Sequence, residues 1–273
     1  MKVLILGGYG VFGGRLARLL IEDGYPVVIA GRSAEKAQAF VDVWGGEVCV
    51  MDRTASDLAD RFVEQGADVV VDASGPFQAY GDADYGVARA ALAAGAHYLD
   101  LADDAGFVAG ISELDEVAQR GGRVVISGAS SVPAISSAVA AELSAELDAV
   151  ELIDTAICPG NRAPRGVSVM RAILGQIGEA VPMWRGGRGC DVPGWSGSVP
   201  VDLGNGMRRR AAFIGAPDPA LLPKALGARS VLFRAGLKLG IMHRALSVMS
   251  WLRRRRLIPT PTSFVGILRK LAV

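Results

Sequence analysis

The sequence predicts an α/β protein: a doubly wound parallel-sheet Rossmann domain with a second, smaller α+β domain. Apolar runs of strand length alternate with helical stretches through the first half, and a glycine-rich motif directly follows the first run. After Ala149 the composition changes, because residues 182–214 are rich in Gly, Pro and Trp and the last segment is apolar and basic. We therefore expect an NAD(P)-binding domain at residues 1–149 and a substrate or dimerisation domain at residues 150–273.

The predicted strands of the first domain are mostly apolar, which is typical of strands that a parallel sheet buries on both faces. These strands are Val3–Leu6, Val27–Ala30, Glu47–Met51, Val69–Asp72, Tyr98–Leu101 and Val124–Ile126. The predicted helices are Gly13–Asp23, Ala34–Trp44, Ser56–Glu64, Asp84–Ala94, Phe107–Arg120 and Ala134–Leu147. Strands and helices that alternate in this way make a Rossmann domain of about 150 residues.

The second half has a different pattern. A strand is predicted over Glu151–Ile157 and a helix over Val167–Ile177. Residues 182–214 carry scattered strand signals and many glycines, which predict a sheet with long loops. The segment Ala220–Val273 is predicted to be helical.

Length and composition exclude several classes of protein. With 273 residues, of which 51% are hydrophobic, the chain can bury a substantial core. Charged residues make up 21% and the formal net charge is +1, which argues against disorder and against nucleic-acid binding through bulk charge. The three cysteines lie far apart and there are only two histidines, so we expect neither a disulfide framework nor a metal site.

The sequence carries no sign of export or of a membrane span. The N-terminal apolar run, Val3–Leu6, ends at Gly7 and is too short for a signal peptide. No apolar run approaches the length of about eighteen residues that a membrane span needs. The expected location is the cytoplasm.

Basic residues are concentrated towards the C-terminus. Eleven Lys and Arg and no acidic residue follow Pro219, which leaves 18 bases against 28 acids in the rest of the chain. The segment Met242–Leu257 combines apolar residues with four consecutive arginines, a composition that suits an anionic membrane surface. We favour packing of its apolar face on the second domain or on another copy of a homo-oligomer.

The strongest functional signal is a GxGxxG motif between the first strand and the first helix. In such motifs one glycine permits a tight turn, the next lets the backbone approach a pyrophosphate, and the third lets helix and strand pack closely. The helix N-terminus then offers free N–H groups to the phosphates. Glycines also end strands for other reasons, but here strand, loop, helix and next strand follow in the required order. The motif consists of Gly8, Tyr9, Gly10, Val11, Phe12 and Gly13.

The second strand predicts which dinucleotide is bound. NAD-specific sites place an acidic residue near the end of this strand, where it holds the ribose hydroxyls. Here no acid occurs between Val27 and Ala34, and the strand is followed by Arg32 and Ser33. Arg32 is placed to bind a 2′-phosphate, with Ser33 as a second donor and Lys36 one turn along the helix. We therefore predict NADP(H).

Further site residues are predicted at the carboxyl ends of later strands, where ligands bind in such sheets. Asp52, after the third strand, is assigned to the cofactor site. Asp100, near the end of the fifth strand, is the candidate catalytic residue, with a turn-capping role as its alternative. His97, Tyr98 and Cys158 fit structural roles better than catalytic ones, and Arg162, Arg165 and Arg171 are candidate clamps for a carboxylate or solvated surface residues. The loop after the fourth strand adds four cofactor residues, namely Ser74, Gly75, Pro76 and Phe77.

Four motifs carry a resemblance to a known family. The motifs GGYGVFG, AGRS, DASGPFQAYG and AGAHYLDLADD occur in that order within residues 1–150. Together they resemble the saccharopine dehydrogenase-like oxidoreductases. The resemblance implies an NADP(H)-binding Rossmann domain whose cofactor site comprises the glycine loop, Arg32 and the Gly75–Phe77 loop. Members of this family tend to be longer, so we expect a second domain that is either naturally short or incomplete.

The resemblance also implies a reaction class. We expect an oxidoreductase that transfers a hydride between NADP(H) and a small-molecule substrate, an imine or secondary amine of an amino-acid-like compound. One alternative is an enoyl reductase that acts on a lipid-type C=C bond. Another is a nucleotide-binding protein without turnover, because the sequence offers no strong proton donor.

Overall fold

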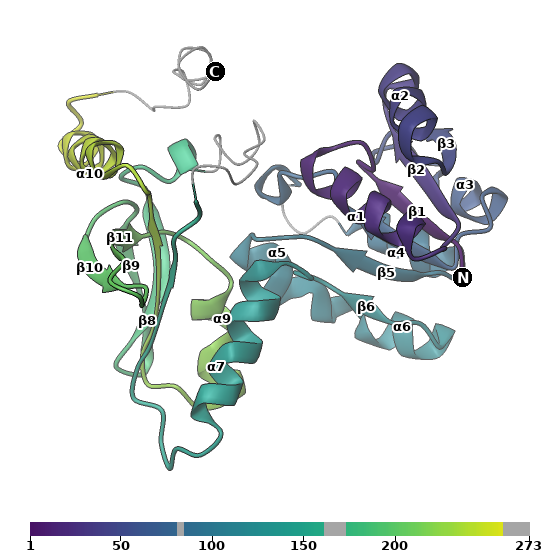
Figure 1. The fold of residues 1–273 in the computed structure, drawn as a ribbon. Helices are drawn as coiled ribbons and strands as arrows, with labels where there is room; N and C mark the ends of the chain where they lie inside the picture. The colour runs from purple at the N-terminus through teal and green to yellow at the C-terminus, as the bar shows by residue number, and fades with distance from the viewer. Residues whose placement is uncertain (81–84, 161–172, 259–273) are drawn as a thin grey trace. The chain divides into compact units, whose positions relative to one another are not determined.

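The structure is a computed structural model that describes residues 1–80, 85–160 and 173–258 (Figure 1). The chain divides into two compact units, Met1–Ser130 and Ser131–Val273. The division predicted after residue 149 assigns helix α7 (Ser136–Ser144) to the first domain, whereas α7 belongs to the second unit. There it contacts helix α9 (Asp218–Leu226).

The first unit contains the predicted parallel sheet, with strand order β3-β2-β1-β4-β5-β6. Every residue of β1, β2 and β4 is buried, as expected for strands covered on both faces. In register, Val3 of β1 lies between Val27 of β2 and Val69 of β4. The strands are β1 (Val3–Leu6), β2 (Val27–Gly31), β3 (Glu47–Val50), β4 (Val69–Asp72), β5 (His97–Asp100) and β6 (Val125–Ile126).

Helices cover both faces of this sheet (Figure 1). Helix α1 (Val11–Glu22) contacts α2 (Ala34–Trp44), and α3 (Leu58–Glu64) contacts α4 (Gly86–Ala93). Each lies close to its predicted range. The doubly wound α/β architecture is therefore confirmed.

The predicted helix Phe107–Arg120 is wrong as a single element. The segment is built from α5 (Ala105–Gly110), a 3-10 turn, η2 (Ile111–Leu114), and α6 (Asp115–Gly121). Glycine is a poor helix former, and Gly110 stands where α5 gives way to the tighter turn. Leu114 in that turn is completely buried, so packing fixes the break.

The second unit contains a mixed sheet with strand order β10-β11-β12-β8-β9, and β7 pairs with β12 in parallel. The prediction of a purely helical segment from Ala220 onward is wrong, because β12 lies within it. The sequence VLFRAG of β12 is almost entirely buried, as expected for a strand between two others. The strands are β7 (Ile153–Ile157), β8 (Ala180–Arg185), β9 (Arg188–Pro193), β10 (Val199–Asp202), β11 (Arg208–Phe213) and β12 (Val231–Gly236).

A sheet over residues 182–214 is confirmed, but its connections are tighter than predicted. Only Gly186 and Gly187 separate β8 from β9, with φ angles of +58° and +82°. Positive φ at both positions is the geometry of a two-residue hairpin turn whose twist matches that of the strands. Gly186 and Gly187 therefore specify a tight hairpin at this connection rather than a long loop.

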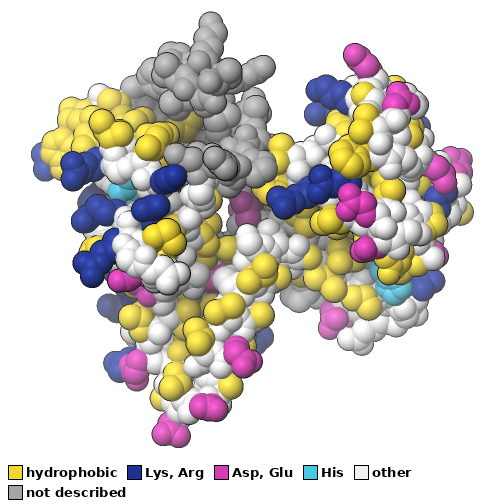
Figure 2. Space-filling model, in the orientation of Figure 1, with side chains coloured by type: hydrophobic (Ala, Val, Ile, Leu, Met, Phe, Trp, Pro, Cys, Tyr) yellow, Lys and Arg dark blue, Asp and Glu magenta, His cyan; other side chains and the backbone are white. Residues whose placement is uncertain are grey.

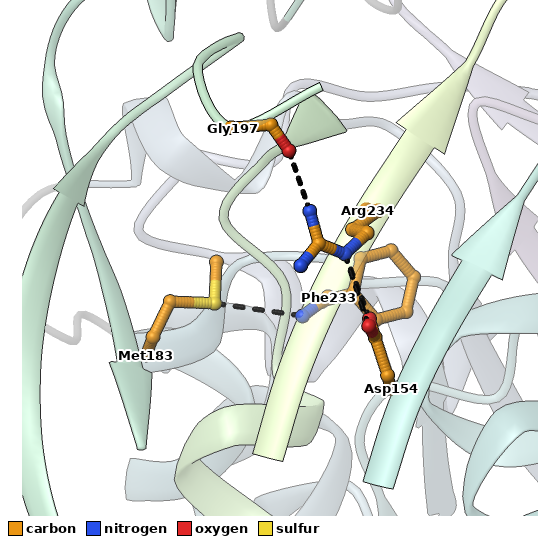
Figure 3. Close-up of polar contacts among 5 residues, drawn as sticks. All are labelled: Asp154, Met183, Gly197, Phe233 and Arg234. Carbon is orange, nitrogen blue, oxygen red and sulfur yellow. Dashed lines mark hydrogen bonds and ion pairs between the residues drawn. The ribbon is translucent and has the colours of Figure 1, made fainter. Parts of the chain in front are cut away.

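The second sheet buries one arginine. Arg234 of β12 is 6% exposed, and its Nε donates to Asp154 Oδ1 at 2.9 Å (Figure 3). Its Nη1 donates to the carbonyl of Gly197 at 2.7 Å, and the guanidinium lies 4.0 Å from the ring centroid of Phe213. Because the charge is paired and hydrogen-bonded, this arginine is tolerated in the interior.

Helix α10 (Gly240–Arg254) packs on the second sheet through one face, where Leu246 and Met249 join the core around Trp195. Ile241 and Trp251 remain exposed, and Figure 2 shows hydrophobic and basic side chains together over α10. Among the described residues, no helix is long and apolar enough to span a membrane.

Two predicted features lie partly or wholly outside the described residues. Within the predicted helix Val167–Ile177, residues 173–175 are helical and 167–172 are not described. The candidate clamps Arg162, Arg165 and Arg171 are also among the residues that are not described.

Candidate functional site

The glycine motif lies directly after β1 and turns into α1, as predicted. Gly10 is the N-cap of α1 and offers no side chain to the helix N-terminus. The first N–H groups of a helix have no intrahelical acceptor, so they remain available to an anion. Val11 and Phe12 are 44% and 54% exposed, which leaves this turn open on its outer side.

Two glycines of this loop are required by close approach of the backbone. A Cβ atom on Gly13 would lie 2.3 Å from the carbonyl oxygen of Gly7. Gly7 itself has a φ of +76°, and a Cβ there would lie 2.8 Å from the carbonyl oxygen of Ala73. The glycine loop therefore packs against the segment that follows β4, so both chain segments meet at one edge of the sheet.

Tyr9 connects the glycine loop to the end of β2. Its hydroxyl accepts a hydrogen bond of 3.0 Å from the backbone N–H of Ser33. Its ring covers Gly31, where a Cβ atom would come within 2.6 Å of the ring. This contact places the loop that carries Arg32 next to the glycine loop.

The residues predicted to bind the 2′-phosphate lie at the start of α2. Ser33 is the N-cap of α2, and its hydroxyl oxygen accepts from the backbone N–H of Lys36 at 3.3 Å. This leaves the hydroxyl proton of Ser33 free to be donated. Arg32 and Lys36 are both exposed. The three residues therefore present donors on one exposed turn.

Asp52 follows β3 on the neighbouring loop. Its Oδ1 accepts from the backbone N–H of Thr54 at 3.0 Å and from the Thr54 hydroxyl at 2.8 Å. These hydrogen bonds, helped by the positive charges of Arg32 and Arg53, lower the pKa of Asp52. Asp52 is therefore an oriented, ionised acceptor beside the loop that carries Arg32.

The end of β4 carries a buried carboxylate. Asp72 is completely buried, and its Oδ1 accepts from both the backbone N–H of Ser74, at 2.9 Å, and the Ser74 hydroxyl, at 2.6 Å. Its Oδ2 accepts from the hydroxyl of Tyr80 at 2.8 Å. Burial raises the pKa of Asp72, and these three hydrogen bonds oppose that shift. Asp72 thereby fixes the loop that contains the predicted residues Ser74 to Phe77.

Phe77, the last of these predicted loop residues, lies in a cluster of aromatic side chains. The ring stacks on Tyr80 with a centroid distance of 4.9 Å and contacts Phe107 at 5.1 Å. Only 6% of Phe77 is exposed. Phe77 is therefore held mainly by packing, and its contact with a nicotinamide stays a prediction.

Asp100 is completely buried at the end of β5. Its Oδ1 accepts from the backbone N–H groups of Ala102, at 2.9 Å, and Gly128, at 2.8 Å, and from the hydroxyl of Ser127 at 3.0 Å. Burial raises the pKa of Asp100 in spite of these bonds. The geometry gives Asp100 an anchoring role, and its part in catalysis stays a prediction.

His97, Tyr98 and Cys158, for which the sequence favours structural roles, each pack or hydrogen-bond within the protein. His97 Nδ1 accepts from the backbone N–H of Val124 at 3.0 Å, and Tyr98 is 1% exposed. Cys158 lies against Gly236, and burial raises the pKa of its thiol.

The sequence prediction missed Asp72 and Arg53 as members of this site. The signal for Asp72 was available, because a carboxylate ends a strand that is otherwise apolar, VVVD. Arg53 lies 3.5 Å from the ring centroid of Tyr80. That contact joins two loops distant in sequence, so no local pattern indicates it.

Comparison with known proteins supports the fold. Over 86% of this chain and 54% of the other, the fold is similar to saccharopine dehydrogenase (L-Glu forming) from Saccharomyces cerevisiae, with a TM-score of 0.63 at 17% identity. The chain therefore spans about half the length of that enzyme. A second similar structure is the WlbA dehydrogenase from Thermus thermophilus in complex with NAD and α-ketoglutarate, with a TM-score of 0.46, 15% identity, and coverage of 86% of this chain and 73% of that one.

The family follows from a match between this sequence and a known protein family. No curated protein matches the chain. Residues 3–166, which are more than half of the chain, match the family described as the saccharopine dehydrogenase NADP binding domain. This range contains the glycine loop, the loop with Arg32 and the buried network at Asp72. The chain belongs to the saccharopine dehydrogenase NADP-binding domain family.

Proposed function

We propose that this protein is an NADP(H)-dependent oxidoreductase that transfers a hydride to or from an imine or secondary amine of an amino-acid-like substrate. Family membership supports a nicotinamide dinucleotide as cofactor. When bound, the cofactor supplies or accepts the hydride.

The site at the end of β1 is the observation that carries this proposal. The uncapped N-terminus of α1 and the glycine loop suit a pyrophosphate, because backbone N–H groups and the helix dipole both favour negative charge. Arg32, Ser33 and Lys36 present donors to a 2′-phosphate, and β2 ends without a carboxylate.

The loop after β4 is the last part of the proposed cofactor site that the first unit provides. Asp72 and Ser74 hold the backbone between Gly75 and Phe77 at the edge of the sheet, next to Gly7. We assign to these residues the orientation of the nicotinamide end of the cofactor. Asp100 is the proposed proton-handling residue, and its test is given in the Discussion.

The second unit is assigned to substrate binding or dimerisation. This assignment rests on the separate mixed sheet of the second unit, which is not part of the nucleotide-binding fold. Because the chain covers only 54% of the yeast enzyme, the activity of that enzyme is a guide to the reaction class and no more.

Two experiments test the proposal. Titration of NADPH and NADH into the protein at fixed salt should show tighter binding of NADPH. Oxidation of NADPH should then be followed with a panel of 2-oxo acid and amine pairs, and separately with enoyl thioesters. Turnover with the first panel supports the proposed reaction, turnover with the second alone supports an enoyl reductase, and binding without turnover supports a nucleotide-binding protein.

A further inference from the structure

Helix α10 carries apolar side chains on two opposite faces, and its inner face is used within the second unit. His243 and Ser250, seven residues apart on that face, are each 1% exposed. Leu246 and Met249 pack in the core around Trp195. The inner face therefore satisfies the packing on the second domain that the sequence favours for this segment.

The opposite face of α10 is exposed. Ile241 is 80% exposed, Val248 56% and Trp251 49%. Together with two exposed arginines these residues recur at three- and four-residue intervals, so they form one stripe along the helix. We call this the outer stripe, and it consists of Ile241, Arg244, Val248, Trp251 and Arg255.

The outer stripe is flanked by further positive charge. Lys238, Arg254 and Arg256 are all exposed beside it. Among the ion pairs of the described residues, α10 contributes Arg253 alone, which pairs with Glu179. No acidic residue follows Asp218 in the sequence, so the charge around the stripe is of one sign. Figure 2 shows these hydrophobic and basic side chains gathered over α10.

We propose that the outer stripe of α10 binds the surface of an anionic lipid membrane. Apolar side chains flanked by bases suit the boundary between acyl chains and anionic headgroups, and tryptophan is enriched at that boundary. The guanidinium carbon of Arg255 lies 4.6 Å from the ring centroid of Trp251, so a base stands directly beside the aromatic side chain. The proposal concerns a surface of the second unit and does not depend on the reaction proposed above.

The charge pattern favours a membrane over a second copy of the chain. Most homodimers are two-fold symmetric, so the same surface of each copy contributes to the contact. Because the outer stripe contains arginines and no carboxylate, such a contact would oppose like charges. An anionic bilayer instead attracts each base, which strengthens binding by about fivefold per base near the surface.

The test is flotation of the intact protein with two kinds of vesicle, phosphatidylcholine alone and equal parts of phosphatidylcholine and phosphatidylserine. Wild type should bind the anionic vesicles and not the neutral ones. Added salt should weaken that binding, because it screens exposed charges.

Two variants test the two components of the stripe. Arg244→Glu should weaken binding by about fivefold or more, and Arg120→Glu, the same charge change at an exposed residue of the first unit, should not. Trp251→Ser should weaken binding by about tenfold, because less apolar surface is then removed from water. Its matched control is Leu143→Ser, since Leu143 is 74% exposed on α7 of the same unit.

Several outcomes would overturn the proposal. These are no binding to either kind of vesicle, equal binding to both, and binding that Arg244→Glu and Trp251→Ser leave unchanged. A concentration-dependent dimer of wild type that Trp251→Ser dissociates, measured by analytical ultracentrifugation, would assign the outer stripe to a second copy instead. Circular dichroism and melting temperatures of the variants establish that the fold is intact in each comparison.

Discussion

The hydroxyl of Tyr9, in the glycine loop, accepts a hydrogen bond of 3.0 Å from the backbone N–H of Ser33, at the start of α2. The ring of Tyr9 rests on Gly31, the last residue of β2. One side chain thus connects the loop that is suited to a pyrophosphate with the turn that is suited to a 2′-phosphate. Because Tyr9 links the two loops, a change that breaks this contact is expected to affect binding at both.

Gly31→Ala tests this link. The new Cβ atom would lie 2.6 Å from the ring of Tyr9, so the ring must move and its hydrogen bond to Ser33 is lost. The affinities for NADPH and NADH should both fall several-fold, since a hydrogen bond contributes about 0.5–1.5 kcal/mol. Isothermal titration measures this effect. Gly189→Ala, where a Cβ atom meets nothing within 4 Å, should leave both affinities unchanged.

Arg32→Ala tests the preference for NADPH. A charge-assisted hydrogen bond to the 2′-phosphate contributes roughly 1.5–3 kcal/mol, which is about ten- to a hundredfold in affinity. The variant should lose that factor for NADPH and keep its affinity for NADH. Titration of both nucleotides at fixed salt measures the ratio. Wild type that binds NADH as tightly as NADPH would contradict the cofactor assignment and leave the fold unaffected.

The first sheet could be predicted from the sequence because its strands are local, apolar runs. Strands such as VLIL and VVVD are buried along their whole length, so composition alone indicates them. The strand β12 was missed because its arginine and its flanking helical segments hide an equally buried run. Its interior charge is paired with Asp154, which lies far away in sequence.

In the candidate site, too, some features follow from local sequence and others depend on tertiary structure. The glycine loop and Arg32 follow from local spacing, since strand, turn and helix are consecutive. The contact between Arg53 and Tyr80 depends on the order of strands in the sheet, and the network at Asp72 depends on how a loop folds back. Both relationships are tertiary and have no periodic signature, so a local sequence pattern does not indicate them.

Asp100→Asn tests whether Asp100 handles a proton. Asparagine keeps a carbonyl oxygen that can accept from Ala102, Ser127 and Gly128, so the anchoring hydrogen bonds should persist. The titratable carboxyl group is lost. Turnover should fall while NADPH affinity stays nearly unchanged, as measured by steady-state kinetics and titration. Full activity in this variant would leave Asp100 with its anchoring role alone.

Asp100→Ala is the companion variant. It leaves three donors in or near the interior without their acceptor, which should cost about 3 kcal/mol or more in the free energy of unfolding. Thermal denaturation measures that cost. A variant as stable as wild type would show that the segment after β6 does not depend on Asp100.

Asp218→Asn tests a pH dependence in the second unit. Asp218 is completely buried at the start of α9, and burial raises its pKa to about 6, although Ser136 donates to Oδ1 at 3.0 Å. The folded protein therefore holds this proton more tightly than the unfolded chain. The stabilisation is complete below about pH 4, the value for a free carboxyl, and is lost as the pH rises through about 6.

Asparagine stays neutral throughout, so the variant lacks this dependence. From about pH 4 to about pH 8, the free energy of unfolding of wild type should fall relative to the variant by an amount on the order of 1–3 kcal/mol. Melting temperatures of both proteins across this range measure the change, and the exposed Asp148→Asn serves as control. A constant difference between wild type and Asp218→Asn would show that Asp218 ionises as readily inside the fold as outside, in spite of its burial.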